Sequence, residues 1–161
     1  MTIETDSNGG VTPLPLWLGY AGLLPQLACL AAIFSDSDTQ WAAQAVAFGY
    51  GALIFSFLGG LWWGLALGRR EAPKWIYAAA VLPSLIALLL WLPWVYGEDW
   101  PGPSMIALGG LILASPLIDR AIGQSLVLPN GWMRLRWHLS LGLGLATFVI
   151  GMLSVQPVMP V

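Results

Sequence analysis

The sequence predicts an all-α integral membrane protein, built as a bundle of five transmembrane helices. Of its 161 residues, 58% are hydrophobic and only 9% are charged, whereas a soluble domain carries about 25% charged residues. The mean hydropathy is +0.76. A chain so poor in charge cannot cover a surface that faces water. Its apolar residues fall into five runs, and in lipid the backbone of such runs is satisfied by a helix.

Charge marks the ends of the first two spans. The first run covers about 14–34 and ends at an acidic stretch. Residues 1–13 before it contain two acidic residues and no Lys or Arg, so they lack the basic segment of a cleaved signal or presequence. We expect these residues to form a disordered tail. The second run covers about 41–67 and stops at Arg69-Arg70. Both runs reach the roughly 20 residues that a span needs.

The remaining three spans follow in the same way. The third covers about 75–96, and the fourth covers about 103–118 and ends just before Asp119. The fourth run is short, because about 16 residues rise only roughly 24 Å in a helix. The fifth covers about 137–155, and residues 156–161 are expected to be a C-terminal tail. Prolines inside the runs predict kinks, and they are Pro25, Pro83, Pro93 and Pro116.

All six basic residues lie in two gaps between apolar runs. One gap holds Arg69, Arg70 and Lys74, and the other holds Arg120, Arg134 and Arg136. The charged residues of the two remaining gaps are all acidic. Because cytoplasmic loops retain Lys and Arg, five spans predict a cytoplasmic N-terminus and a C-terminus outside. Most of the ten Trp residues fall near run ends, which is typical of interfacial belts.

The second span carries an unusual row of glycines. Gly60, Gly64 and Gly68 are four residues apart, so they share one helical face as two overlapping G-x-x-x-G motifs. Small residues let helix backbones approach closely in a bilayer. We expect this glycine zipper to pack within the bundle, and contact with another chain is the alternative. Matching small faces on the fourth and fifth spans are Gly110 with Ala114 and Gly142 with Ala146.

Two stretches of the sequence are similar to a known family. The first reads Ser56-Phe57-Leu58-Gly59-Gly60-x-x-Trp63-Gly64. The second reads Leu128-Pro129-x-x-Trp132-Met133-x-Leu135-Arg136-x-x-Leu139-Ser140. They resemble the DUF3429 family, which includes transmembrane protein 69, and the resemblance spans roughly residues 14–155. Here Met133 replaces the family's usual aromatic and Ser140 its usual Thr. The resemblance implies a small multi-span protein, here of a bacterial inner membrane, with no assigned biochemical role and no catalytic residue.

One polar cluster lies beside the second basic gap, at the cytoplasmic interface. Its members, besides Arg120, are Asp119, Arg134, Arg136 and His138. We expect Asp119 at the end of the fourth span to pair with Arg136 at the start of the fifth and to pin the loop between them. The alternative is a site for an anionic headgroup or phosphate, which Arg binds well. Within the first span, Gln26 is expected to cap the carbonyl that Pro25 leaves free.

The sequence contains few residues that could act in catalysis or bind a metal. It has one His and one Cys and none of the common nucleophile, zinc or phosphate-loop motifs, so we expect no enzyme, no metal and no cofactor. No basic tract suits nucleic acid. We therefore expect a structural, assembly or interaction factor, whose partners are membrane lipids and either a second copy or another membrane protein. The alternative function is binding or passive transport of a lipid or hydrophobic small molecule between the helices.

Overall fold

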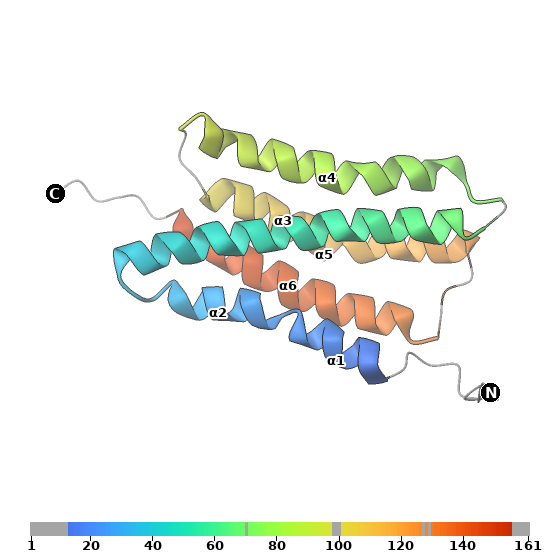
Figure 1. Ribbon diagram of the computed structural model, residues 1–161, viewed down its shortest axis with the longest axis horizontal. Coiled ribbons are helices and arrows are strands. Elements are labelled where there is room, and N and C mark those ends of the chain that lie inside the picture. Colours follow the sequence, from blue (N-terminus) through green and yellow to red (C-terminus); the bar gives the residue numbers. More distant parts are fainter. Residues whose placement is uncertain (1–12, 70, 98–100, 127, 129, 156–161) are drawn as a thin grey trace, which may run out of the picture.

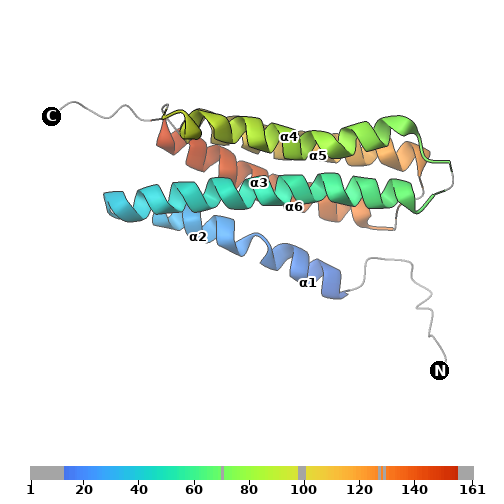
Figure 2. The ribbon, with the colours of Figure 1, turned by 45° about the horizontal axis from the view of Figure 1, so that its top comes forward.

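The computed structural model describes residues 13–155 except 70, 98–100, 127 and 129. These residues form an elongated bundle of helices (Figures 1 and 2). The predicted tails at 1–13 and 156–161 lie outside the described residues, apart from Pro13, which is the first residue of a helix. The helices are α1 (Pro13–Ala21), α2 (Leu24–Ala32), α3 (Ser37–Leu67), α4 (Lys74–Val95), α5 (Gly102–Ser125) and α6 (Trp132–Ser154).

The predicted fold class is confirmed. Five helical segments are long and apolar enough to cross a membrane, with α1 and α2 counted together as Pro13–Ala32. The start of α1, the α3–α4 connection and the α5–α6 connection lie at one end of the bundle, and the end of α6 lies at the other (Figure 1). The described basic residues of the two predicted gaps therefore gather at the end where α1 begins.

The first span is interrupted, although the sequence predicted one continuous run. Helix α1 ends at Ala21 and α2 begins at Leu24. Pro25 stands in the first turn of α2, where its missing N–H costs no helical hydrogen bond. The carbonyl of Gly22 in the break accepts a hydrogen bond from the Tyr50 hydroxyl on α3. The break therefore stays satisfied within the bundle, as the bilayer requires of irregular backbone.

Gln26 does not have the role predicted for it. Its side chain is fully buried, and its Nε2 donates to Thr147 Oγ1 on α6 at 2.9 Å. Thr147 in turn donates to the carbonyl of Leu143 at 2.8 Å. The prediction that Gln26 caps a carbonyl freed by Pro25 is wrong, because Pro25 begins a helix and frees no carbonyl within one. Gln26 instead links the broken first span to α6.

Three helices begin or end away from the predicted positions. Helix α5 continues past 118 to Ser125, and α6 begins at Trp132 instead of near 137. Helix α3 begins at Ser37 because Asp36 caps it, with Oδ1 accepting the Thr39 N–H at 3.1 Å. This backbone N–H, followed by the Thr39 hydroxyl, holds the pKa of the Asp36 carboxyl below its usual value. The pattern of hydropathy predicted where the spans lie but not where these helices begin and end, because local hydrogen bonds determine the helix ends.

Glycines bring α5 and α6 into close contact. A Cβ atom on Gly109 would lie 2.7 Å from the Phe148 nitrogen and 2.9 Å from the Gly144 carbonyl oxygen. A Cβ on Gly151 would lie 3.0 Å from the Gly102 carbonyl oxygen. The glycines repeat every seven residues on each helix, so two levels of the interface depend on the absence of side chains. The sequence analysis had not singled out this pattern.

The glycine row of α3 lies on the outside of the bundle. A Cβ on Gly60 or Gly64 would have no atom within 4 Å, and one on Gly68 would meet only its own helix. The prediction that this row packs within the bundle is therefore wrong. The glycine that does face the bundle is Gly59, whose Cβ would collide with the carbonyl of Ala80 on α4. Four-residue spacing identifies a helical face, but it does not say which way that face points.

The small faces predicted on the last two spans also differ from the structure. Gly110 has open space around it, whereas its neighbour Gly109 makes the close contact with α6. A Cβ on Gly142 would meet the Leu23 side chain at 2.8 Å. Gly142 therefore faces the break between α1 and α2 and does not contact α5.

Candidate functional site

A buried ion pair joins α5 to α6. Arg136 Nε lies 2.7 Å from Asp119 Oδ2, and the two side chains are 7% and 1% exposed. The pairing of Asp119 with Arg136 that the sequence predicted is confirmed. Asp119 precedes the end of α5 at Ser125 by six residues, which is roughly 9 Å along the helix. An isolated charge at that depth would be costly, and the pair removes the net charge.

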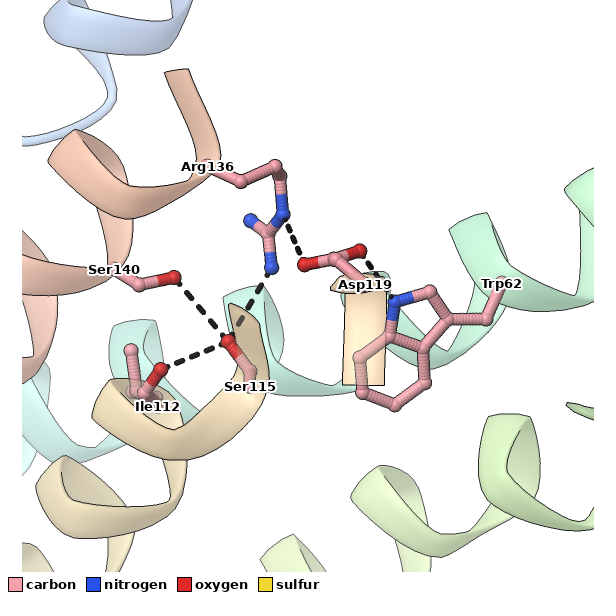
Figure 3. A network of polar contacts seen from close by, with 6 residues as sticks. All are labelled: Trp62, Ile112, Ser115, Asp119, Arg136 and Ser140. Atoms are coloured by element: carbon pink, nitrogen blue, oxygen red, sulfur yellow. Dashed lines mark hydrogen bonds and ion pairs between the residues drawn. The ribbon is translucent and has the colours of Figure 1, made fainter. Parts of the chain in front are cut away.

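Three further side chains complete this polar network (Figure 3). Trp62 on α3 donates its Nε1 to Asp119 Oδ1 at 2.9 Å. Ser115, one turn before Asp119, lies 3.3 Å from Arg136 Nη2 and donates to the carbonyl of Ile112 at 2.8 Å. Ser140 Oγ lies 3.2 Å from Ser115 Oγ. Both carboxylate oxygens of Asp119 are thus engaged, and three helices are fixed by one network.

The other predicted members of the polar cluster lie outside this network. Arg134 is exposed on the first turns of α6. His138 is also exposed, and its Nδ1 lies 2.8 Å from the hydroxyl of Tyr20 on α1. Both residues line a cavity of about 240 Å³ at the basic end. The cluster predicted from sequence therefore divides into a buried pair and an exposed group, and anion binding by the exposed group stays a prediction.

Trp62 and Ser115 are the network residues that the sequence analysis missed. A buried indole N–H needs an acceptor, and Trp62 stands inside its run, away from the ends where interfacial Trp residues gather. The position of Trp62 inside its run was the sequence feature that could have identified it as a buried hydrogen-bond donor. Trp41 near the start of α3 and Trp94 near the end of α4 do lie near helix ends. The Trp94 ring centroid is 6.5 Å from that of Trp41 and 5.8 Å from that of Trp91. Trp63 is partly exposed and meets Tyr77 edge-on at 5.2 Å.

Among the described residues, no three His, Cys, Asp or Glu side chains gather closely enough to hold a metal ion. The polar network is instead a neutral arrangement of hydrogen bonds. Each oxygen of its carboxylate accepts one hydrogen bond, Oδ1 from Trp62 and Oδ2 from Arg136. The arrangement therefore supports positioning of helices.

Comparison with known proteins identifies the family. Residues 11–152 match a family model described as "Protein of unknown function (DUF3429)". The chain belongs to the DUF3429 family. This DUF3429 chain is also 32% identical, over 101 residues, to transmembrane protein 69 of Xenopus tropicalis. That match covers 62% of the chain but only 39% of the relative. No solved structure matches.

The structure brings together the stretches that carried the resemblance to DUF3429. The first stretch supplies Trp62, and the second supplies Arg136 and Ser140. They meet at Asp119 on α5, between the two stretches in sequence. Residues within both stretches thus take part in one buried polar network, although the stretches are about 70 residues apart; Trp62 itself is not one of the positions that carried the resemblance.

Proposed function

We propose that this polytopic membrane protein is a non-catalytic interaction factor that associates with a second copy of itself through the outward face of α3. The observation that carries the proposal is the open space at Gly60 and Gly64. Glycine in a helix is less favourable than Ala by about 1 kcal/mol. Packing of another helix against the row offsets this cost, because small residues allow backbones to approach.

The surroundings of the glycine row suit another helix. Large, exposed apolar side chains flank the glycines, which have no side chain. They are Leu53, Phe57 and Leu67, which are 71%, 65% and 65% exposed. A second copy offers the same surface, so a two-fold contact would place glycines on both sides of the interface. By contrast, Gly59 and Gly109 are already covered by neighbouring helices. On α3, open space recurs at two glycines one turn apart, Gly60 and Gly64, and this suits a contact between chains.

The buried network supports this role by holding α3 in place. Trp62 is on the same helix as the glycine row and is 3% exposed. Its indole bond to Asp119 ties α3 to α5, and Asp119 ties α5 to α6. A face presented by a fixed helix binds with less loss of conformational entropy. The network thus supports binding through α3 without taking part in chemistry.

The test compares Gly64→Leu with Gly110→Leu in the full chain. An added Cβ atom would meet nothing within 4 Å at either position, so the two substitutions are matched in their local surroundings. Dimerisation is measured by energy transfer between labelled chains in lipid vesicles of increasing dilution. We expect Gly64→Leu to abolish the dimer and Gly110→Leu to leave it intact. A wild-type chain that stays monomeric at all dilutions, or an equal response of both variants, contradicts the proposal.

We also propose that the N-terminal end of the bundle faces the cytoplasm of a bacterial inner membrane. Arg69, Lys74, Arg120 and Arg134 lie at the bundle end where α1 begins (Figure 1), and cytoplasmic ends retain such residues. Reporter fusions test this orientation. Alkaline phosphatase fused after α6 should be active and the same enzyme fused after α3 should be inactive, and the opposite pattern would overturn it.

A further inference from the structure

A second feature of the bundle is a cavity of about 340 Å³ beside the buried network. It lies where the break between α1 and α2 faces α3, α5 and α6. Its walls are mainly apolar, and they include Leu18, Leu23, Ile54, Phe57, Leu139 and Leu143. Phe57 is 65% exposed, so the cavity reaches the lipid-facing surface at this side chain. Its volume lies within the range of small-molecule sites, which is roughly 300–1,000 Å³.

Arg136 and Ser140 are the polar side chains in this cavity wall. Arg136 uses Nε for Asp119 and Nη2 for Ser115. Within the described part of the chain, its Nη1 makes no hydrogen bond, and Figure 3 shows that atom directed away from Asp119 and Ser115. Nη1 is therefore the donor available to a molecule in the cavity. A charged N–H in a mainly apolar wall that lacks an acceptor forgoes a hydrogen bond, so an acceptor there would be stabilising.

The charge of the site selects the kind of acceptor. Asp119 already neutralises Arg136 across 2.7 Å, and the cavity is lined by no other charged residue. An anionic head would bring an unbalanced negative charge into apolar walls, which is costly. A neutral carbonyl oxygen accepts from Nη1 without that cost. The apolar walls and the opening at Phe57 suit a molecule that arrives from the bilayer.

We propose that this cavity binds an apolar membrane-soluble molecule with a neutral carbonyl group, whose oxygen accepts a hydrogen bond from Arg136 Nη1. The cavity shares Phe57 with the outward face of α3, but Gly60, Gly64 and Gly68 do not line it. Both stretches that carried the family resemblance contribute to it, with Phe57 from α3 and Arg136 and Ser140 from α6.

The first experiment measures equilibrium binding to the purified full chain in lipid nanodiscs. The probes are a decyl benzoquinone, a didecanoyl glycerol, decylbenzene and decanoate. We expect one or both carbonyl probes to bind about tenfold more tightly than decylbenzene, because a hydrogen bond to a charged donor contributes at least that factor. The first two probes distinguish a quinone from a glycerol ester as the natural source. Equal binding of decylbenzene, or tighter binding of decanoate, overturns the proposal.

Adjacent substitutions on α3 then locate the site. Ile54 lines the cavity and Leu53 is exposed to lipid, so Ile54→Trp should fill the cavity and Leu53→Trp should not. We expect at least a tenfold loss of carbonyl-probe binding in Ile54→Trp alone, with unchanged helical content in both variants. Equal binding by the two variants overturns the placement.

A spectroscopic measurement tests the hydrogen bond itself. With a ¹³C-labelled carbonyl probe, the carbonyl stretch should move to lower wavenumber on binding. Arg136→Lys keeps the charge opposite Asp119 but removes Nη1, so the shift should disappear in this variant. A shift that survives in a folded Arg136→Lys variant overturns the assignment of Nη1. If that variant does not fold, the Ile54→Trp comparison decides the site by itself.

Discussion

Replacing Asp119 by Leu should strongly destabilise the bundle. The substitution removes the partner that lies 2.7 Å from Arg136 Nε and the acceptor that lies 2.9 Å from Trp62 Nε1. It leaves the positive charge of Arg136 without a counter-ion, with Ser115 as its remaining partner, and the Trp62 indole N–H without an acceptor. Losing one member of a buried pair costs about 3–5 kcal/mol, whereas an unpaired Arg within a span costs about 2.5–3.5 kcal/mol.

The lower figure applies here because of the position of Arg136. It stands four residues after the start of α6 at Trp132, so its long side chain can turn toward the interface and recover some hydration. We therefore expect about 3 kcal/mol, which is roughly a hundredfold change in the unfolding equilibrium. The measurement is reversible unfolding in mixed detergent micelles of increasing dodecyl sulfate fraction, followed by circular dichroism.

A double-mutant cycle separates the ion pair from simple loss of packing. Asp119→Leu combined with Arg136→Met removes both charges, so the pair should be less destabilised than the sum of the single variants by about 1–3 kcal/mol. Arg120→Met is the control, because Arg120 is the exposed neighbour of Asp119 and should change stability by under about 0.5 kcal/mol. Additive single effects, or a cost below about 1 kcal/mol for Asp119→Leu, would refute the reasoning.

Three further predictions use the same unfolding measurement. Gly109→Ala should cost about 1–3 kcal/mol, since its Cβ would lie 2.7 Å from backbone of α6, whereas the neighbouring Gly110→Ala should be neutral or stabilising. Equal effects would contradict the close contact of α5 with α6. Thr147→Val should cost about 1 kcal/mol by leaving the buried Gln26 amide without its acceptor. No loss would show that this bond contributes nothing. Because hydrogen bonds lower the pKa of Asp36 in the folded state, its contribution to stability is complete above the usual carboxyl pKa and is lost as the pH falls through the lowered pKa. Asp36→Asn should therefore lose less stability than the wild type when the pH is lowered from 5 to 2, and an identical acid response would contradict this.

Part of the site could be predicted because charge is so rare in this chain. Asp119 and Arg136 stand beside the same gap between two apolar runs, and few other groups could neutralise either of them. Their pairing followed from the cost of charge in hydrocarbon. Trp62 and Ser115 could not be assigned in the same way. Nothing in a run of apolar residues specifies which indole or hydroxyl lies opposite a carboxylate on another helix.

The sequence by itself determined the membrane class, the five spans and the collection of basic residues in alternate gaps, which lie at one end of the bundle. Tertiary structure decided the break at Gly22, the glycine contact between α5 and α6, and the outward direction of Gly60 and Gly64. The physical reason is the solvent. In water, an apolar stripe marks the face of a helix that points inward. In lipid both faces are apolar, so spacing reveals that glycines share a face, and only packing against neighbouring helices fixes where that face points.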